Sequence, residues 1–329
     1  MKRIVTDGVV LLSATLLALS SVCWAQTKVA QVGILAQREG VALPLFQTFE
    51  RVLSERGWVP GKNVILRYKV PDTEELRFSK GAQELVRDKV DLIYAPSAPA
   101  MHAAFAATRT IPIVTLDYST DPVTAGYVEN YARPGKNVTG IFLDAPQFAS
   151  KWLEILKGIN PKLSKVAVLW DPSPGKVHVD GLQAAARVLG VTLQVHEVRK
   201  PEDIDAAFLA LRKNSQAVVQ LPSPLMYAQS ARVGALTRQH KILGISIWRR
   251  FSEAGGAVTY GPEFGESIQR SAAIVAKILA GTKASDVPIE RPMRFEFLLN
   301  MKTIKALNLK VPDAYLVGAV EVEDKDVPR

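Results

Sequence analysis

Short apolar runs alternate with amphipathic helical patterns along this chain, and the alternation occurs twice in succession. The apolar runs cover residues 28–36, 64–70, 91–95, 111–116 and 138–143, and then 165–170, 192–198, 217–221 and 242–247. Continuous Val, Ile and Leu runs are typical of strands that are buried on both faces of a parallel sheet. Strands separated by helices indicate right-handed crossovers. The sequence therefore predicts an α/β fold with two doubly wound parallel-sheet lobes joined by a hinge.

The length of the chain agrees with two domains, because 329 residues exceed what one core usually organises. After the second set come a strand-like run at 257–260, a helical pattern at 264–279, a run at 295–299 and a short helical pattern at 301–307. This remainder is too small for a third domain. We expect residues 26–143 plus 250–290 to form an N-terminal lobe and residues 144–249 plus 291–329 a C-terminal lobe, with several crossings between them.

The N-terminus has the layout of a secretory signal peptide. Lys2 and Arg3 precede an apolar run at residues 9–19, and small residues lead to a cleavage position after Ala25. The run is shorter than the roughly 20 residues that a bilayer-spanning helix needs. We therefore expect residues 1–25 to be removed and the mature chain to be periplasmic.

Cys23 is the only cysteine, and it bears on how the mature chain would be held. A lipid-anchored protein would begin at this cysteine, but lipoprotein signals place a small residue before it, where this chain has Val22. We expect an unanchored chain without a disulfide or a thiol nucleophile. No later segment reaches about 18 uninterrupted apolar residues, so the mature chain is not expected to span a membrane.

Charge and motifs argue against nucleic-acid binding and against catalysis. The formal net charge is +9, but lysine and arginine are scattered instead of gathered in one stripe. His102, His178, His196 and His240 are isolated, with no second ligand at metal spacing. Residues 244–248 begin like a nucleophile elbow around a serine, but a tryptophan stands where the closing glycine belongs. We expect no enzyme activity, no metal and no cofactor.

Polar and aromatic residues follow the predicted strands at their carboxyl ends, where open α/β sheets bind ligands. Two such edges facing one another would form a cleft, in which aromatic rings supply contact area and polar groups orient the ligand. The candidate ligand-binding residues are Gln37, Arg38, Ser97, Ala98, Asp117, Tyr118, Trp170, Asp171, Ser223 and Trp248.

Several of these residues have a purely structural alternative. Trp170 and Trp248 could pack between the lobes, and Asp117 and Asp171 could be turn or N-cap residues. Ser97 stands where a helix N-cap is expected, a role that is compatible with binding an anion at that helix N-terminus. The remaining basic candidate, at position 38, could be a solvated charge at the rim.

Nine segments together resemble one known family. They are residues 57–64 (GWVPGKNV), 89–93 (KVDLI), 110–114 (TIPIV), 121–123 (DPV), 132–140 (ARPGKNVTG), 260–262 (YGP), 278–281 (ILAG), 286–292 (DVPIERP) and 295–297 (FEF). In this order the chain is similar to the ABC-transporter substrate-binding proteins of the tryptophan/tyrosine-uptake type, which have the type I periplasmic binding protein fold. Lys136 and Trp58 depart from the residues common in that family, glycine and tyrosine, and both lie in turns.

The resemblance implies a hinged protein that delivers a solute to an ABC permease in the inner membrane. We expect a monomer that binds a small carboxylate-bearing molecule, such as an aromatic amino acid. Its carboxylate would meet Ser97 and neighbouring N–H groups, and its amine would meet Asp117 or Asp171. Two alternatives remain open: an exported hydrolase or isomerase with Ser246 as its nucleophile, and a ligand-sensing module for a membrane receptor.

Overall fold

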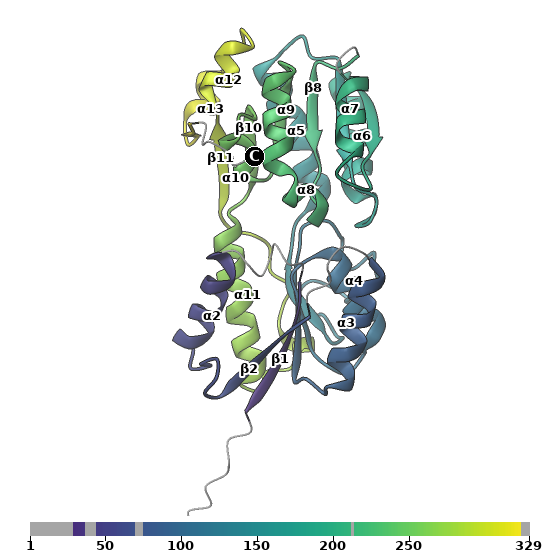
Figure 1. Ribbon diagram of the computed structural model, residues 1–329, viewed down its shortest axis with the longest axis vertical. Helices are drawn as coiled ribbons and strands as arrows, with labels where there is room; N and C mark the ends of the chain where they lie inside the picture. Colours follow the sequence, from purple (N-terminus) through teal and green to yellow (C-terminus); the bar gives the residue numbers. More distant parts are fainter. Residues whose placement is uncertain (1–28, 37–43, 70–74, 212–213, 324–329) are drawn as a thin grey trace, which may run out of the picture.

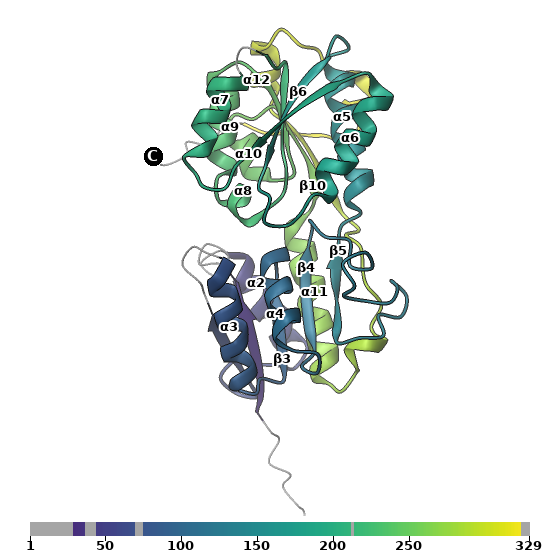
Figure 2. The same ribbon diagram turned by 90° about the vertical axis from the view of Figure 1, so that its right-hand side faces the viewer.

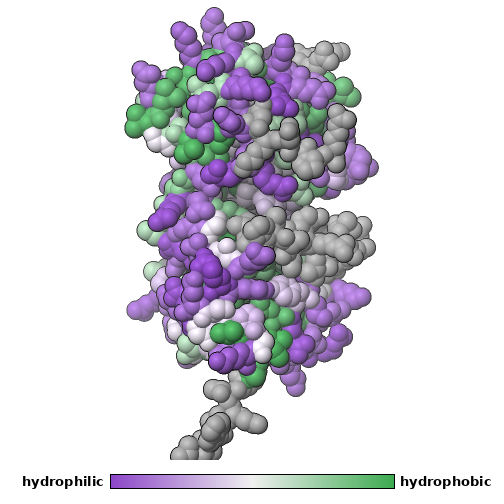
Figure 3. Space-filling model, turned by 60° about the vertical axis from the view of Figure 1, so that its left-hand side comes forward, coloured by the Kyte–Doolittle hydropathy of each residue, from purple (hydrophilic) through white to green (hydrophobic). Residues whose placement is uncertain are grey.

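The computed structural model describes residues 29–36, 44–69, 75–211 and 214–323, and these residues form two lobes stacked end to end (Figure 1). The expected signal peptide, with Cys23, lies outside the described residues, as do the candidates Gln37 and Arg38. The space-filling view shows the surface narrowing to a waist between the lobes (Figure 3).

The first lobe is a five-stranded parallel sheet in the order β2-β1-β3-β4-β5. Its strands are β1 (Ala30–Leu35), β2 (Val64–Lys69), β3 (Leu92–Ala95), β4 (Ile113–Asp117) and β5 (Val138–Phe142). One face is covered by α3 (Glu75–Arg87) and α4 (Ala98–Ala107), and the other by α2 (Pro44–Glu55) and α11 (Phe264–Leu279) (Figures 1 and 2). Both faces of β1, β3, β4 and β5 are buried, which explains why these four strands are apolar runs, whereas the edge strand β2 is partly exposed.

A glycine permits the close pairing of β4 and β5 at the edge of this sheet. Gly140 lies opposite Thr115 and has a φ of 141°. A Cβ at this position would lie 2.1 Å from the Thr115 carbonyl oxygen, so only glycine fits without moving the strand. The pairing holds Asp117 at the end of β4 beside Phe142 of β5.

The second lobe is a seven-stranded sheet in the order β12-β11-β10-β9-β8-β6-β7. Its strands are β6 (Lys165–Trp170), β7 (Thr192–Glu197), β8 (Ala217–Gln220), β9 (Leu243–Ser246), β10 (Val258–Pro262), β11 (Phe295–Leu299) and β12 (Val320–Glu321). The helices are α5 (Ala145–Ile159), α6 (Val177–Leu189), α7 (Asp203–Leu211), α8 (Pro224–Ala228), α9 (Ser230–Gln239), α10 (Arg249–Glu253), α12 (Met301–Ala306) and α13 (Asp313–Leu316). Two of them, α5 and α6, pack together on one face, while α7, α9 and α10 cover the other (Figure 2).

The chain passes between the lobes three times: between β5 and α5, between β10 and α11, and before β11. The predicted boundary at residue 250 is therefore wrong for the segment up to Pro262, because α10 and β10 belong to the second lobe. A periodic pattern identifies a strand but not the sheet with which it pairs. The segment that follows, α11, packs on the first lobe as expected, with the 3₁₀ turn η1 (Ala284–Asp286) against β5.

One further detail differs from the predicted parallel sheets. β11 runs antiparallel to β10, because the returning chain enters the second sheet from the end at which the other strands leave it. Between β8 and β9, a break at Gln229 separates α8 from α9. Within the described residues, no helix has both the length and the apolar content to cross a membrane.

Candidate functional site

The carboxyl ends of the two sheets meet at the interface between the lobes. From the first lobe, Ser119 donates a hydrogen bond through its hydroxyl to the carbonyl oxygen of Pro222, at 3.1 Å. From the second lobe, the Nε2 of buried His178 donates to the carbonyl oxygen of Tyr118, at 2.6 Å. The loop after β4 is therefore in contact with the segment that follows β8 and with the start of α6.

Four aromatic side chains form a cluster at this interface, hereafter the cleft cluster. The rings of Tyr118 and Trp248 lie 6.3 Å apart and nearly parallel, at 29°. Tyr227 packs edge-on against Trp248 at 4.9 Å, and Phe264 does so at 5.7 Å. In this structure Trp248 therefore packs between the lobes, which is the structural alternative predicted for it. Its partner across the interface is Tyr118, another predicted candidate.

Two polar atoms of the cleft cluster, and one of the neighbouring Asp117, have no hydrogen-bond partner in the described part of the chain. The indole N–H of Trp248, the hydroxyl of Tyr118 and the Oδ2 of Asp117 are buried and have no hydrogen-bond partner among the described residues. Each such group costs on the order of 1–3 kcal/mol when it is left unpaired. Unpaired polar atoms beside apolar rings are what a site needs to orient a bound molecule.

Asp117 is the last residue of β4, directly before Tyr118, and it is 1% exposed. Its carboxylate acts electrostatically on Tyr127. Its Oδ1 accepts the Ser119 N–H at 2.8 Å, the turn role that the sequence allowed. Burial raises the pKa of Asp117 to about 6, and its hydrogen bonds oppose that rise. Burial likewise raises the pKa of Tyr118 above its ordinary range. A cation brought to Oδ2 would remove the cost of the buried negative charge.

Ser97 and Ser223 hold equivalent positions in the two lobes, each as the N-cap of the helix after a central strand. Ser223 accepts the Met226 N–H at 3.0 Å, whereas Ser97 accepts the Ala100 N–H at 3.4 Å. The cap predicted for Ser97 is confirmed. Ala98, the first residue of α4, is buried.

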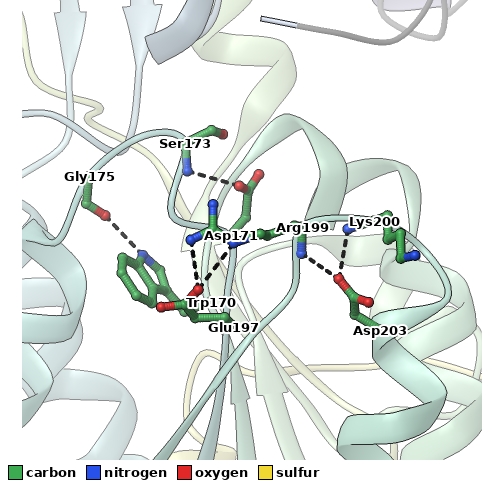
Figure 4. Close-up of polar contacts among 8 residues, drawn as sticks. All are labelled: Trp170, Asp171, Ser173, Gly175, Glu197, Arg199, Lys200 and Asp203. Atoms are coloured by element: carbon green, nitrogen blue, oxygen red, sulfur yellow. Dashed lines mark hydrogen bonds and ion pairs between the residues drawn. The ribbon is translucent and has the colours of Figure 1, made fainter.

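Trp170 and Asp171 lie at the end of β6, in a loop that is ordered by its own contacts (Figure 4). The indole of Trp170 donates to the Gly175 carbonyl oxygen at 2.9 Å, and the Oδ1 of Asp171 accepts the Ser173 N–H at 2.9 Å. Among the described residues, no ring contact links Trp170 to the cleft cluster. The turn role weighed for Asp171 is present, and a ligand role for either residue remains a prediction.

Three residues at the interface between the lobes are not among the predicted candidates: Tyr227, Phe264 and Arg250. Arg250 is exposed and holds its guanidinium 5.9 Å from the centre of the Tyr227 ring. The neighbouring Arg249 instead forms an ion pair with Glu296, at 2.6 Å. Tyr227 lies in the short helix α8, close to the break at Gln229, and its ring packs against Trp248.

The alternative nucleophile, Ser246, is buried at the end of β9. Its Oγ accepts the Trp248 N–H at 3.3 Å, which anchors the turn into α10.

Comparisons with known proteins identify the family and the fold of this chain. The family described as ABC transporter substrate binding protein matches residues 32–323. A protein named "Tyrosine-binding protein" from Clostridioides difficile (strain R20291) is 26% identical over 266 residues, covering 80% of this chain and 76% of that protein.

Two solved structures are similar over most of the chain. An ABC domain from Streptococcus pneumonia in complex with L-Trp has a TM-score of 0.79 at 19% identity, and the match covers 89% of this chain and 99% of that one. A ligand-free, open substrate-binding protein with adhesive properties from Clostridium difficile has a TM-score of 0.65 at 25% identity, covering 90% and 100%.

Proposed function

This chain belongs to the family of ABC transporter substrate-binding proteins, and on that basis we propose that it binds an aromatic amino acid between its lobes. It then presents the amino acid to an ABC permease in the inner membrane. The observation that carries the proposal is the cleft cluster, where Tyr118 of the first lobe and Trp248 of the second face one another beside unpaired polar atoms.

The ring of the ligand would enter between Tyr118 and Trp248. Their centroids are 6.3 Å apart, whereas two successive ring contacts need about 7–8 Å at a carbon–carbon separation of 3.5–4.0 Å. A small opening of the lobes would make that room. Closure onto the ring would then restore contact on both sides, so the ligand would favour the closed form through both lobes.

The two charged ends of the amino acid would meet opposite rims. The amine suits Oδ2 of Asp117, which is buried and unpaired. The carboxylate suits Arg250, whose guanidinium lies over Tyr227 and has no ion-pair partner among the described residues. The name of the curated relative and the L-Trp in one similar structure support a ligand of this kind.

Isothermal titration calorimetry on the purified mature chain tests the proposal with a panel of the twenty amino acids. We expect heat of binding for tryptophan, tyrosine or phenylalanine, and a loss of at least tenfold in affinity in a Trp248→Ala variant, because large apolar contact area is removed. An absence of binding across the whole panel would reject this ligand class.

We further propose that the mature protein is a periplasmic monomer without a lipid anchor. The basic segment, apolar run and Ala25 cleavage position support this, as does Val22 before Cys23. Intact mass measurement of the exported protein would give the chain from residue 26. A mass that starts at Cys23 with added acyl chains would contradict it, and light scattering would report the oligomeric state.

A further inference from the structure

A second hollow lies at the hinge, apart from the cleft cluster. Its volume is about 300 Å³, near the lower end of the range for small-molecule pockets. It opens where the end of β5 leads into α5 and where the returning chain enters β11, next to β10. Its lining residues are Leu143, Asp144, Gln147, Phe148, Lys151, Tyr260, Arg291, Pro292 and Phe295.

One wall of this hinge pocket is aromatic. The rings of Phe148 and Tyr260 are stacked at 5.5 Å and 21°, and Phe295 lies 5.2 Å from Phe148. Phe295 is 43% exposed, which is unusual for a ring that already has two aromatic neighbours. This wall therefore presents apolar ring surface to the hollow, and a planar ring is the ligand group that would cover it best.

The other wall is charged. Arg291 forms an ion pair with Asp144 and also lies over the Tyr131 ring, at 4.9 Å. Among the residues that the structure describes, Lys151 forms an ion pair with Glu154 alone, at 3.2 Å, and both of these side chains are close to half exposed. Exposed pairs of this kind contribute little, so the ammonium group is available to another anion.

The start of α5 adds to the attraction for an anion. Asp144 is the N-cap residue of α5, but it makes no side-chain cap hydrogen bond to the described N–H groups, because its carboxylate is directed to Arg291. Because Pro146 has no N–H, the first-turn N–H groups left for a ligand carboxylate are those of residues 145 and 147.

We propose that the hinge pocket is a second binding site, for a single-ring aromatic carboxylate. The ring lies on Phe148, Tyr260 and Phe295, and the carboxylate meets Lys151, Arg291 and the start of α5. A volume of about 300 Å³ admits one ring with a short acidic group. The proposal is independent of the ligand that occupies the cleft.

Fluorine NMR with 4-fluorobenzoate as the probe tests this site on the purified mature chain. We expect line broadening with the wild-type protein and with a Trp248→Ala variant, which alters only the cleft. The Phe295→Ala and Phe295→Leu variants should weaken binding at least tenfold, and the leucine variant keeps the apolar volume while it removes the ring. Met293→Ala is the matched control, because Met293 is 70% exposed, two residues away, and outside the lining.

Replacing the probe with 4-fluorobenzyl alcohol should also reduce binding at least tenfold, since the carboxylate is lost. Crystals soaked in 4-iodobenzoate should show anomalous density between Phe295 and Lys151. The proposal is overturned by an absence of broadening at millimolar probe, by equal binding of the alcohol, or by binding that Trp248→Ala abolishes and both Phe295 variants preserve.

Discussion

In the first lobe the chain leaves β3 through Pro96 and Ser97, and in the second it leaves β8 through Pro222 and Ser223. Both serines cap the helix that follows, so the two rims of the cleft start from the same local design. The rims then differ in charge. The first rim carries the buried carboxylate of Asp117, and the second carries aromatic rings and an exposed guanidinium.

This difference indicates how the site would select its ligand. A molecule with an amine at one end and a carboxylate at the other would satisfy both rims only in one orientation. A molecule that lacks either charge would leave one rim unpaired. Substitutions on either rim should therefore have separate and measurable effects.

The largest effect concerns the buried carboxylate of the first rim. Burial raises the pKa of Asp117 to about 6, against an ordinary value of about 3.9 in the unfolded chain. Between these values the native protein binds more protons than the unfolded chain, so this residue's contribution to stability falls as the pH rises.

We expect the free energy of unfolding to fall by about 2 kcal/mol from about pH 4 to pH 7, relative to an Asp117→Asn variant. Urea denaturation of both proteins across that range measures the difference. If the free energy of unfolding of the two proteins changes in parallel with pH, burial of the Asp117 carboxylate does not destabilise the native protein.

An intermediate effect concerns the guanidinium of the second rim. Arg250→Gln should weaken binding of an aromatic amino acid about tenfold, which corresponds to roughly 1.4 kcal/mol for a charge-assisted contact. Arg249→Gln is the matched control, because that arginine is already paired with Glu296. Equal losses in the two variants, measured by calorimetry, would remove Arg250 from the site.

The smallest effect separates the two serine caps. Ser223→Ala should cost about 1 kcal/mol of stability, as expected for a well-formed N-cap, because Ser223 accepts the Met226 N–H at 3.0 Å. Ser97→Ala should cost less, since its bond to Ala100 is 3.4 Å long. Thermal or urea unfolding measures both values, and a larger loss at Ser97 would reverse this ranking.

The elements of the fold could be predicted closely where local physical chemistry decides them. The predicted bounds of α11 and β11 agree with the structure residue for residue. Gly57 follows α2 with a φ of 89°, a conformation that favours glycine at the end of a helix. Apolar periodicity, capping residues and glycine act over a few neighbouring residues, so they can be recognised in the chain alone.

The candidate site was predicted in part. Asp117, Tyr118 and Trp248 were predicted as strand-end residues, and the rings of Tyr118 and Trp248 face one another across the two lobes. A ligand role for these residues remains a prediction. Tyr227, Arg250 and Phe264 were not selected, because they lie inside helices whose orientation depends on a break or a crossing. No periodic pattern reports where such a helix points.

By itself, then, the sequence determined the order of strands and helices, the doubly wound character of both lobes and the strand ends at which polar residues gather. The tertiary structure alone decided that β10 stays in the second lobe, that β11 runs antiparallel, and that residues 143–151 and 291–295 enclose a pocket. The reason is physical: local preferences depend on neighbours along the chain, whereas sheet pairing and pocket formation depend on segments that meet only after the chain has folded.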